Sequence, residues 1–487
     1  MSDVAEQTAQ RRAKVAALRA GGANPYPARF HRTHTAADAI AAFEADPDAT
    51  IPVIVAGRLV AKRVMGKATF AHLQDWSGRI QLFARRDALG PAYDAFLDFD
   101  LGDIVGVEGT LMRTRTGEIT VDLAKAALLA KSLHPLPDKW HGLTDVEKRY
   151  RQRYLDLITN EDTRRIVRLR SRVVAAIRRF LDSRGFVEVE TPVLQLVPGG
   201  AAARSFKTYY DALDAEVHLR ISLELYLKRL LVGGMDKVYE LGRVFRNEGV
   251  SHKHNPEFTL LETYEAYADY LDVLTMVEEL LATVVQEVHG SLQIDLGEHT
   301  IDFTPPWRRE TLRDAIYRRS GIDFVDYPDA ESLRAVLRER GLHVDPSLGR
   351  GKLIDELLTT FVEPTLIQPT FLLDYPIELS PLAKKKEDDP TLVERFEGFV
   401  GGVEIANAFS ELNDPDDQRA RFEAQLAERA AGDEETEGLD EDFLLALEHG
   451  MPPAGGLGIG IDRLVALLAG AHSLREVILF PQLRSVR

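Results

Sequence analysis

The sequence predicts an α+β protein in which a small N-terminal β-barrel precedes a larger domain of helices and strands. The length of 487 residues is enough for two or more domains at roughly 100–200 residues each. Within residues 51–130, apolar and polar residues alternate in short runs broken by glycine-containing turns, as in consecutive antiparallel strands. Beyond residue 145, amphipathic stretches such as 163–184 and 268–289 alternate with strand-like runs, which is typical of an α+β domain.

The composition is that of an ordinary globular protein, with 45% hydrophobic and 28% charged residues, and it argues against a wholly disordered or fibrous chain. No cysteine occurs, which excludes structural disulfides, thiol catalysis and zinc or iron–sulfur sites built on cysteine. No apolar run approaches the roughly 18 residues of a membrane span, and residues 1–22 lack a secretory apolar core. We therefore expect a cytoplasmic protein with no membrane partner.

The net charge of −17 argues against a protein that coats nucleic acid non-specifically, because phosphate binding needs clustered cations. The charge is uneven along the chain. The first 160 residues hold 22 Lys and Arg against 19 Asp and Glu, a balance of +3, so the remainder carries −20. Residues 51–90 alone have a balance of +5, whereas 433–442 (DEETEGLDED) are expected to form an acidic, solvated loop. Two parts of different charge indicate two different partners.

The expected elements follow in order along the chain. Residues 4–20 are rich in Ala, Arg and Leu and predict a short basic surface helix. Strand-like runs within 51–87 and 103–129 predict about five short strands. These suggest a small barrel, and the oligonucleotide-binding (OB) type is the leading candidate for its fold. Residues 133–145 contain two prolines and a glycine and are interpreted as a linker. The expected domains are 1–145, with the helix, barrel and linker, and 146–487.

Two common nucleotide-binding fingerprints are absent from the sequence. No G-x-x-x-x-G-K-[ST] occurs, since GRGK at 349–352 lacks the upstream glycine spacing and the Ser or Thr. The glycine-rich run at 455–463 fails the G-x-G-x-x-G spacing because Arg463 occupies the last position. Any nucleotide chemistry must therefore use another architecture.

The first polar constellation lies in residues 238–267, where two strand-like runs flank a polar loop at 247–255. In the second run, period-2 alternation places four residues on one face: Phe258, Leu260, Glu262 and Tyr264. The loop adds three polar residues: Arg246, Glu248 and His254. A surface hairpin with ion pairs is the better interpretation for any one of these residues, but together they favour a site.

The second constellation lies in residues 395–414, where Gly401–Gly402 can form a two-residue turn. Phe399 then pairs with Glu404, and Glu397 becomes a diagonal neighbour of Glu404 at roughly 7–8 Å. Two carboxylates at that reach suit a shared Mg²⁺, whereas two separate solvated carboxylates are the alternative. Three further residues have the opposite parity: Asn407, Phe409 and Glu411. For all five to face one cavity, the strand needs a bulge or bend near Ala406.

The third constellation lies in residues 457–470, where glycines allow close backbone approach and Asp462–Arg463 open an apolar helix. An arginine at a helix N-terminus is poorly placed for the helix dipole, so we expect an anionic partner there. A structural arginine bonded to a neighbouring Asp is an equally good interpretation in isolation.

Several segments resemble a known enzyme family. RGFVEVETPVL at 184–194, FRNEG through HNPEF at 245–258 and GLGIGIDR at 456–463 resemble, in order, motifs 1, 2 and 3 of class II aminoacyl-tRNA synthetases. Their order and spacing match over residues 148–487. Six further segments resemble the lysyl-tRNA synthetase family in particular: MGKATFAHLQDWSGRIQLF (65–83), RYRQRYLDLI (149–158), PGGAAAR (198–204), ELYLKRL (224–230), NAFSELND (407–414) and LALEHGMPP (445–453). The likeness therefore spans nearly the whole chain.

The resemblance implies an N-terminal OB anticodon-binding domain and a six-stranded antiparallel catalytic sheet with helices. It also implies a homodimer, with motif 1 and its Pro192 at the interface. The implied reaction is that of a lysine–tRNA ligase. Lysine and ATP give lysyl-adenylate and pyrophosphate, and lysine is then transferred to the 3′ end of tRNA(Lys).

The resemblance also implies the sites for L-lysine and the anticodon. Glu224 and the Gly200 backbone would hold the α-ammonium group. Glu262, Tyr264 and Glu411 would hold the ε-ammonium group, while Asn407 and Phe409 would line the pocket. A substrate with two ammonium groups needs carboxylates, because an unpaired buried charge is costly. Phe70 would stack on an anticodon base, with Gln81 and Arg63 as polar contacts, although Phe70 could equally be an ordinary core residue.

For ATP, the resemblance implies that Arg246 bridges the lysine carboxylate and the α-phosphate, with Phe258 beneath adenine and Glu248 at its amino edge. His254 and Arg463 would grip the β- and γ-phosphates. Glu397 and Glu404 would hold Mg²⁺ as the cofactor.

Three positions depart from the family pattern, and several alternatives remain open. Leu223 and Ser205 stand where the family usually has proline, and Thr263 stands where it has leucine, which puts pocket rigidity and lysine affinity in question. A synthetase of the aspartate/asparagine branch and a protein-lysylating paralogue are nearby alternatives. A catalytically silent tRNA-binding or regulatory paralogue is the alternative of a different class. Loss of Arg246, Arg463 or the Glu397/Glu404 pair would mark the silent case, and all four are intact.

Overall fold

The computed structural model describes residues 3–137, 143–249, 251, 254–430 and 439–484 of the chain. It divides into two compact units, Met1–Thr144 and Asp145–Arg487. Of the linker expected at 133–145, residues 138–142 lie outside the described residues. No helix in the described part of the chain is long and apolar enough to cross a membrane.

The smaller unit is a five-stranded closed barrel with strand order β1-β2-β3-β5-β4, as the alternating pattern predicts. Leu59, Leu82 and Val121 are among the alternating apolar residues that fill the barrel, and a register shift after Leu59 lets β1 pair with β2 as well as β4. The strands are β1 (Pro52–Met65), β2 (Ala68–Gln74), β3 (Arg79–Arg85), β4 (Ile104–Arg113) and β5 (Ile119–Ala130). The helices are α1 (Asp3–Ala20), α2 (Ala36–Ala45), α3 (Arg86–Leu89) and α4 (Ala92–Leu97).

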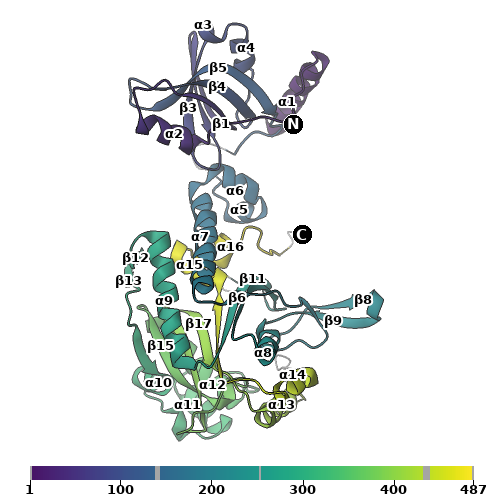
Figure 1. Ribbon diagram of the computed structural model, residues 1–487, viewed down its shortest axis with the longest axis vertical. Coiled ribbons are helices and arrows are strands. Elements are labelled where there is room, and N and C mark those ends of the chain that lie inside the picture. Colours follow the sequence, from purple (N-terminus) through teal and green to yellow (C-terminus); the bar gives the residue numbers. More distant parts are fainter. Residues whose placement is uncertain (1–2, 138–142, 250, 252–253, 431–438, 485–487) are drawn as a thin grey trace. The chain divides into compact units, whose positions relative to one another are not determined.

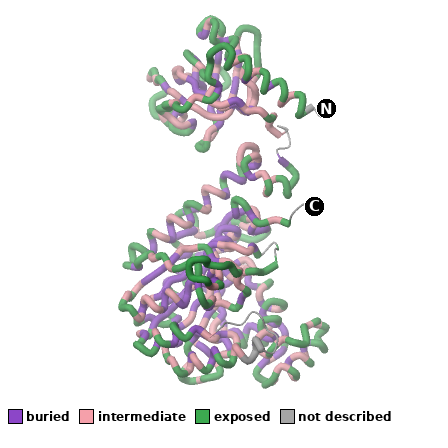
Figure 2. The backbone as a smooth tube through the Cα atoms, turned by 90° about the vertical axis from the view of Figure 1, so that its right-hand side faces the viewer, coloured by how far each residue is buried: buried purple, intermediate pink, exposed green. Residues whose placement is uncertain are grey.

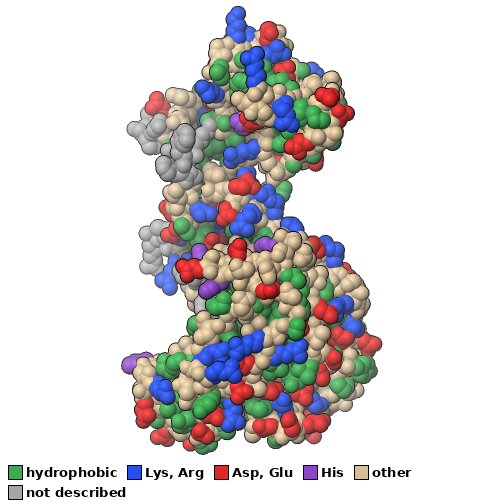
Figure 3. Space-filling model, turned by 90° about the vertical axis from the view of Figure 1, so that its left-hand side faces the viewer, with side chains coloured by type: hydrophobic (Ala, Val, Ile, Leu, Met, Phe, Trp, Pro, Cys, Tyr) green, Lys and Arg blue, Asp and Glu red, His purple; other side chains and the backbone are tan. Residues whose placement is uncertain are grey.

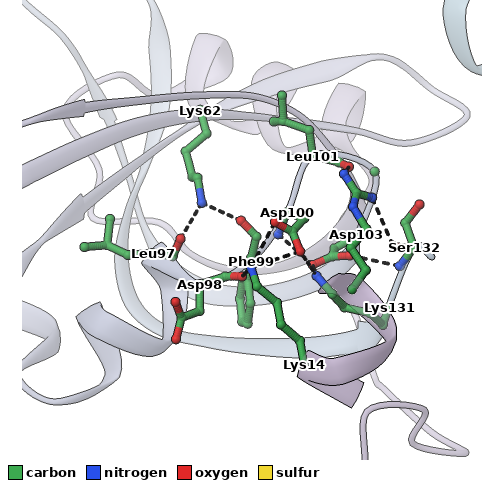
Figure 4. Close-up of polar contacts among 12 residues, drawn as sticks. Lys14, Lys62, Leu97, Asp98, Phe99, Asp100, Leu101, Asp103, Lys131 and Ser132 are labelled. Atoms are coloured by element: carbon green, nitrogen blue, oxygen red, sulfur yellow. Dashed lines mark hydrogen bonds and ion pairs between the residues drawn. The ribbon is translucent and has the colours of Figure 1, made fainter. Parts of the chain in front are cut away.

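A cluster of lysines and aspartates ties α1 to the barrel (Figure 4). Lys131 is buried and pairs with both Asp100 and Asp103, while Lys14 of α1 donates to Asp100 at 3.0 Å. Lys62 of β1 donates to the Leu97 carbonyl at 2.6 Å. Because Lys131 is paired with carboxylates and Lys62 with backbone carbonyls, the cluster avoids the penalty of an isolated buried ion.

The larger unit contains an eight-stranded sheet with order β14-β15-β16-β17-β18-β11-β10-β6. The six strands from β15 to β10 are antiparallel, as the resemblance implies, but β14 and β6 add a parallel strand at each edge. The prediction of six strands is wrong, because these two short strands extend the sheet to eight. Each pairs with a strand that is distant in sequence, and local sequence patterns do not reveal such pairing. The strands are β6 (Val187–Glu188), β10 (Lys237–Phe245), β11 (Glu257–Ala266), β14 (Arg308–Thr311), β15 (Thr370–Pro376), β16 (Leu392–Val400), β17 (Val403–Ser410) and β18 (Ala454–Gly460).

Helices α7 (Glu161–Ser183), α9 (Tyr270–His289) and α15 (Ile461–Ala469) pack on this sheet and form its main core (Figure 1). The amphipathic stretches that predict helices at 163–184 and 268–289 are thereby confirmed. Asp269 caps the start of α9 through a capping box with Asp272, and Gly290 ends it in the left-handed conformation.

The remaining elements surround the sheet. The hairpin of β8 (Lys207–Tyr210) and β9 (Ala215–Leu219) projects from the larger unit and is largely exposed, in contrast to the buried central strands (Figure 2). Two short helices, α5 (Val146–Arg151) and α6 (Arg153–Thr159), precede α7. The other strands and helices are β7 (Leu194–Gln195), β12 (Gln293–Leu296), β13 (His299–Asp302), α8 (Glu224–Val232), α10 (Leu312–Ser320), α11 (Ala330–Glu339), α12 (Arg350–Leu357), α13 (Pro415–Ala430), α14 (Glu441–Glu448) and α16 (Leu474–Val477).

The surface charge of the larger unit is mixed despite its acidic balance. Figure 3 shows a band of Lys and Arg side chains across this unit among scattered Asp and Glu. Of the acidic segment predicted as a loop at 433–442, residues 433–438 lie outside the described residues. The prediction is wrong for Glu441 and Asp442, which form the first turn of α14, where carboxylates interact favourably with the helix dipole.

Arg153 joins the start of the larger unit to its C-terminal segment. This residue is 1% exposed, and its guanidinium donates to Asp156 at 2.7 Å and to the Leu479 carbonyl at 2.9 Å. It also donates to the carbonyls of Arg475 and Ile478. One buried cation therefore satisfies four acceptors from segments more than 300 positions apart in sequence.

We expect Arg153→Met to lower the free energy of unfolding of the larger unit by about 3 kcal/mol, because it leaves buried acceptors without their donor. Chemical denaturation followed by circular dichroism measures this. Arg179→Ala is the control, since the Arg179 side chain is 59% exposed and its pair with Glu287 lies at the surface. Equal stability of the two variants would contradict the anchoring role.

Candidate active site

A cavity of about 260 Å³ opens on the face of the sheet formed by β11, β17 and β18. It brings together thirteen of the fourteen residues that the sequence singles out for lysine, ATP and magnesium, and the exception is Glu397. The thirteen are Gly200, Glu224, Arg246, Glu248, His254, Phe258, Glu262, Tyr264, Glu404, Asn407, Phe409, Glu411 and Arg463. Residues from five separate segments of the chain therefore meet at one place.

Strand β11 supplies the central row of the cavity. Phe258, Leu260, Glu262 and Tyr264 all line it, so the face predicted from period-2 alternation is confirmed. The strand is held on both sides, because β10 and β18 pair with it in antiparallel register. A strand in the middle of a sheet offers a rigid support for polar side chains that must be positioned accurately.

The β16–β17 hairpin adds the next row and contains the predicted irregularity. Val400 pairs with Val403 across Gly401–Gly402, and Phe399 pairs with Glu404, as the two-residue turn predicts. The register then shifts, so that Gly398 pairs with Ala406 and Glu397 pairs with Asn407. The extra residue is a β-bulge next to Ala406, and it lets Glu404 and Asn407 line the same cavity despite their parity.

Glycines of β18 make room for the acids. A Cβ atom on Gly456 would lie 1.9 Å from Glu411 Oε1 and 2.7 Å from Tyr264 Cε1, so no larger residue can occupy this position without displacing them. Gly200 is similar, since its φ is +87° and a Cβ there would lie 2.9 Å from Ser222 Oγ. The sequence indicates close approach in this strand, but it does not show which side chains approach.

Glu262 lies at the centre of a buried group of acids. Its carboxylate accepts hydrogen bonds from Ser222 Oγ at 2.7 Å, from the Leu223 backbone N–H at 3.2 Å and from Tyr264 OH at 3.1 Å. Burial, together with the charge of Glu224, raises the pKa of Glu262 to about 7. Burial also raises the pKa of Glu411 well above its usual value. A cationic ligand that paired with these carboxylates would favour their ionised forms.

The three departures from the family pattern leave this group intact. Leu223 donates the backbone N–H to Glu262 just described, a bond that the usual proline lacks. Ser205 Oγ is hydrogen-bonded to His218 Nδ1 at 2.7 Å. Thr263 is buried on the face of β11 opposite the cavity.

Lys228 is a buried residue beside the cavity that the sequence interpretation missed. It is fully buried behind the cavity and pairs with Glu224 at 2.5 Å and with Glu411. Its pKa is raised, because the two carboxylates outweigh the effect of burial, which alone would lower it. The Glu224–Lys228 spacing of four residues on a helix could have signalled the first pair, whereas Glu411 is distant in sequence.

The other half of the cavity is cationic and aromatic. The Arg246 guanidinium lies 5.1 Å from the centre of the Phe258 ring, and its Nε donates to the Ile221 carbonyl at 3.2 Å. Arg463 Nη1 pairs with Glu404 Oε2 at 2.8 Å, while Asp462 pairs with Arg170 instead. Arg463 therefore lines the cavity and pairs with the Glu404 carboxylate rather than with its neighbouring Asp, while its binding of a ligand anion stays a prediction.

Glu397 lies beside the cavity rather than in its lining. Its carboxylate accepts from Tyr375 OH at 2.8 Å and pairs with Arg395 at 2.5 Å. Arg395 Nε also donates to Asn407 Oδ1 at 3.0 Å, which links Glu397 to the lining. Burial raises the pKa of Glu397 to about 7, with Arg395 opposing the shift and Glu404 adding to it.

The barrel has its own groove, of about 810 Å³, and Phe70, Arg63 and Gln81 all line it. Phe70 is half-buried, lies outside the barrel core and stacks on Phe83 at 4.6 Å between ring centres. The interpretation of Phe70 as a core residue is therefore wrong. Gln81 is 9% exposed, and its side-chain oxygen accepts from Thr120 Oγ1 at 2.8 Å.

Comparison with known proteins gives two family matches. The family described as class II tRNA synthetases (D, K and N) matches residues 145–484, and the OB-fold nucleic acid binding domain matches residues 53–129. The chain is 56% identical over 483 residues to the lysine–tRNA ligase of Dehalococcoides mccartyi, covering 98% of this chain and 97% of the relative. It is 55% identical over 472 residues to that of Moorella thermoacetica (97% and 96%) and 52% identical over 485 residues to that of Bacillus subtilis (98% and 97%).

We expect the Glu262 carboxyl to make the protein less stable as the pH rises. The native pKa of about 7 lies above the ordinary 4.5, so the contribution of this group is complete below pH 4.5 and lost as the pH passes through about 7. Glu262→Gln removes the titration and should exceed the wild type in free energy of unfolding by about 3 kcal/mol at pH 8, with the difference shrinking toward pH 4.5. Denaturant titrations across this range measure it, with Glu265→Gln as the control on the same strand. A difference that does not vary with pH would contradict the raised pKa.

Proposed function

The chain belongs to the lysyl-tRNA synthetase family of class II aminoacyl-tRNA synthetases, and from that membership we propose how its residues divide between lysine, ATP, magnesium and tRNA. Its function is lysine–tRNA ligation, in which ATP activates L-lysine to lysyl-adenylate and lysine is then joined to tRNA. Nothing in the sequence or the fold favours a catalytically silent tRNA-binding protein.

The group of buried acids is the observation on which the lysine site rests. Glu224, with the Gly200 backbone, holds the α-ammonium group, and Glu262, Glu411 and the Tyr264 hydroxyl hold the ε-ammonium group. Asn407 and Phe409 line the pocket between them. An amino acid without a second ammonium group would leave buried carboxylates unpaired, so these acids select lysine by the cost of desolvation.

The cationic half of the cavity receives ATP. Phe258 stacks beneath adenine, Glu248 accepts from its amino group, and His254 and Arg463 neutralise the β- and γ-phosphates. Arg246 lies between the two halves and bridges the lysine carboxylate and the α-phosphate.

The chemical step is an in-line displacement. A carboxylate oxygen of lysine attacks the α-phosphorus, the bond from phosphorus to the bridging oxygen breaks, and pyrophosphate leaves with that electron pair. No general base is needed, because the lysine carboxylate is already ionised at neutral pH. The residues act by positioning the reactants and by neutralising the charge on the phosphates.

Glu397 and Glu404 fit a magnesium ion as carboxylate donors. The two lie close enough for the charge of Glu404 to raise the pKa of Glu397, so a divalent cation between them would relieve their repulsion. Glu397 and Glu404 would hold Mg²⁺ there, and it would supply charge neutralisation for the ATP phosphates. Arg395 and Tyr375 hold Glu397 in place for this role.

The barrel groove receives the anticodon of tRNA(Lys). A half-buried aromatic in a groove that also contains Arg63 and Arg113 suits a single-stranded loop, whose bases stack on aromatics while arginines meet phosphates. Phe70 is the stacking residue, and Gln81 and Arg63 supply polar contacts.

We infer that the protein is a homodimer and acts in the cytoplasm. Motif 1 and the positions just after it expose large apolar side chains around Pro192, with Val187 49%, Leu194 48% and Leu196 65% exposed. Such a patch is typical of a surface that another chain covers, and a second copy with the same patch suits a twofold interface.

We expect Arg246→Ala to lower lysine-dependent ATP–pyrophosphate exchange by about 10³-fold, because it removes the cation shared by the carboxylate and the α-phosphate. Arg243→Ala, which changes an exposed arginine outside the cavity, is the control. Wild-type protein that exchanges equally with asparagine, or not at all with lysine, would overturn the lysine assignment.

We expect Phe70→Ala to lower kcat/KM for charging of tRNA(Lys) by about tenfold while pyrophosphate exchange stays at the wild-type rate, because one stacked base is lost. Trp76→Ala serves as the control, since Trp76 is a 51% exposed aromatic of the same unit that does not line the groove. Parallel loss of both activities would mean that Phe70 supports the fold instead.

A further inference from the structure

Lys228 has an unusual setting for a lysine. Lys228 belongs to α8, and its side chain is completely buried. Its ammonium group pairs with Glu224 at 2.5 Å and with Glu411. The ammonium nitrogen also lies 5.4 Å from the centre of the Phe409 ring. It does not line the cavity, so it stands behind the two carboxylates that face the substrate.

The Lys228 ammonium links the two ends of the lysine site. Glu224 belongs to the proposed α-ammonium site and Glu411 to the proposed ε-ammonium site, and one buried cation contacts both. In the described part of the chain, neither carboxylate oxygen of Glu411 accepts a hydrogen bond of good geometry, so the ion pair with Lys228 is its evident partner. The Lys228 ammonium group therefore pairs with two of the acids, Glu224 and Glu411, at the same time.

The formal charges of the cluster match those of the substrate only when Lys228 is counted. Glu224, Glu262 and Glu411 bring three negative charges, and Lys228 reduces the balance to two. L-lysine brings two ammonium groups, while its carboxylate is assigned to Arg246. Without Lys228, one carboxylate would stay unpaired in a buried site or take up a proton.

We propose that Lys228 is a positioning residue, a built-in counter-cation that keeps Glu224 and Glu411 available as carboxylates and matches the acid cluster to the two ammonium groups of L-lysine. This role rests on the proposed lysine site and adds a determinant of its affinity. The raised pKa values of Glu262 and Glu411 agree with it, since they show how strongly the acids already resist ionisation with Lys228 present.

The other charged groups near α8 have partners of their own. On the α14 side, Arg229 pairs with Asp440 and Asp442, and on β10 Glu240 pairs with Arg220. From β11, Glu262 and Tyr264 belong to the acid cluster itself. Arg246 also lines the cavity and interacts electrostatically with Glu262. Lys228 is the cation that forms ion pairs with Glu224 and Glu411 among the residues that the structure describes.

The test is the pH dependence of KM for L-lysine in ATP–pyrophosphate exchange by full-length Lys228→Met. In the wild type, KM should rise as the pH falls through about 7, where Glu262 gains its proton. In the variant, the acids hold their protons more tightly, so this midpoint should move up by about one pH unit and KM at pH 7 should rise about fivefold. The kcat at saturating lysine and the KM for ATP should change by less than about threefold, since the phosphate-binding residues are untouched.

A variant of the barrel separates this role from simple stabilisation. Lys131 is also buried between two carboxylates, Asp100 and Asp103, but in the other unit (Figure 4). Lys131→Met should lower stability yet keep the wild-type KM and midpoint for lysine. Lys228→Gln is a second neutral variant, used if Lys228→Met does not fold.

The outcomes separate this proposal from the assignment of the lysine site. An unshifted midpoint in a folded neutral Lys228 variant, whatever its KM, would overturn the counter-cation role. Failure of the wild type to exchange with lysine would instead overturn the proposed function.

Discussion

The burial of several carboxylates on one face of a single sheet is the constraint around which the larger unit is organised. Removing a carboxylate from water is costly unless it is hydrogen-bonded or paired, and here Glu262 and Glu411 are buried while also lining the cavity. The chain meets this constraint with neighbouring polar groups. Ser222, the Leu223 backbone and Tyr264 donate to Glu262, and Lys228 pairs with Glu411 from behind.

The need to accommodate these buried carboxylates also explains two uncharged features of the backbone, a glycine and a β-bulge. Gly456 has no side chain because Glu411 and Tyr264 occupy the space that a Cβ atom would need. The bulge between Glu404 and Ala406 changes the parity of β17, so residues on both sides of it face the same cavity. Because β11 and β17 both pair with β18, small shifts of these strands are resisted by the whole sheet. The acids are therefore held on a rigid support, as the proposed lysine site requires.

Local patterns in the sequence predict much of this arrangement. The alternation in β11 identifies Phe258, Glu262 and Tyr264 as one face, and the Gly401–Gly402 turn determines the register that requires a bulge. The parts that the pattern does not reveal depend on contacts between distant segments. Lys228 pairs with Glu411 across the fold, and the parallel edge strands β6 and β14 join through long connections. Glu397 pairs with Asn407 and lies on the same face of the sheet. Its carboxylate contacts Arg395 and Tyr375 and lies beside the cavity, a position that alternation alone does not predict.

In the proposed site, L-lysine binds by pairing its ammonium groups with carboxyl groups whose burial disfavours ionisation before the ligand binds. The most direct measurement is the number of protons exchanged when L-lysine binds at pH 7, obtained by calorimetry in buffers of different ionisation enthalpy. A dicationic ligand lowers the pKa of the acids it contacts, so binding should release about one proton per site to the buffer. Binding with no proton exchange, or with net proton uptake, would contradict the account.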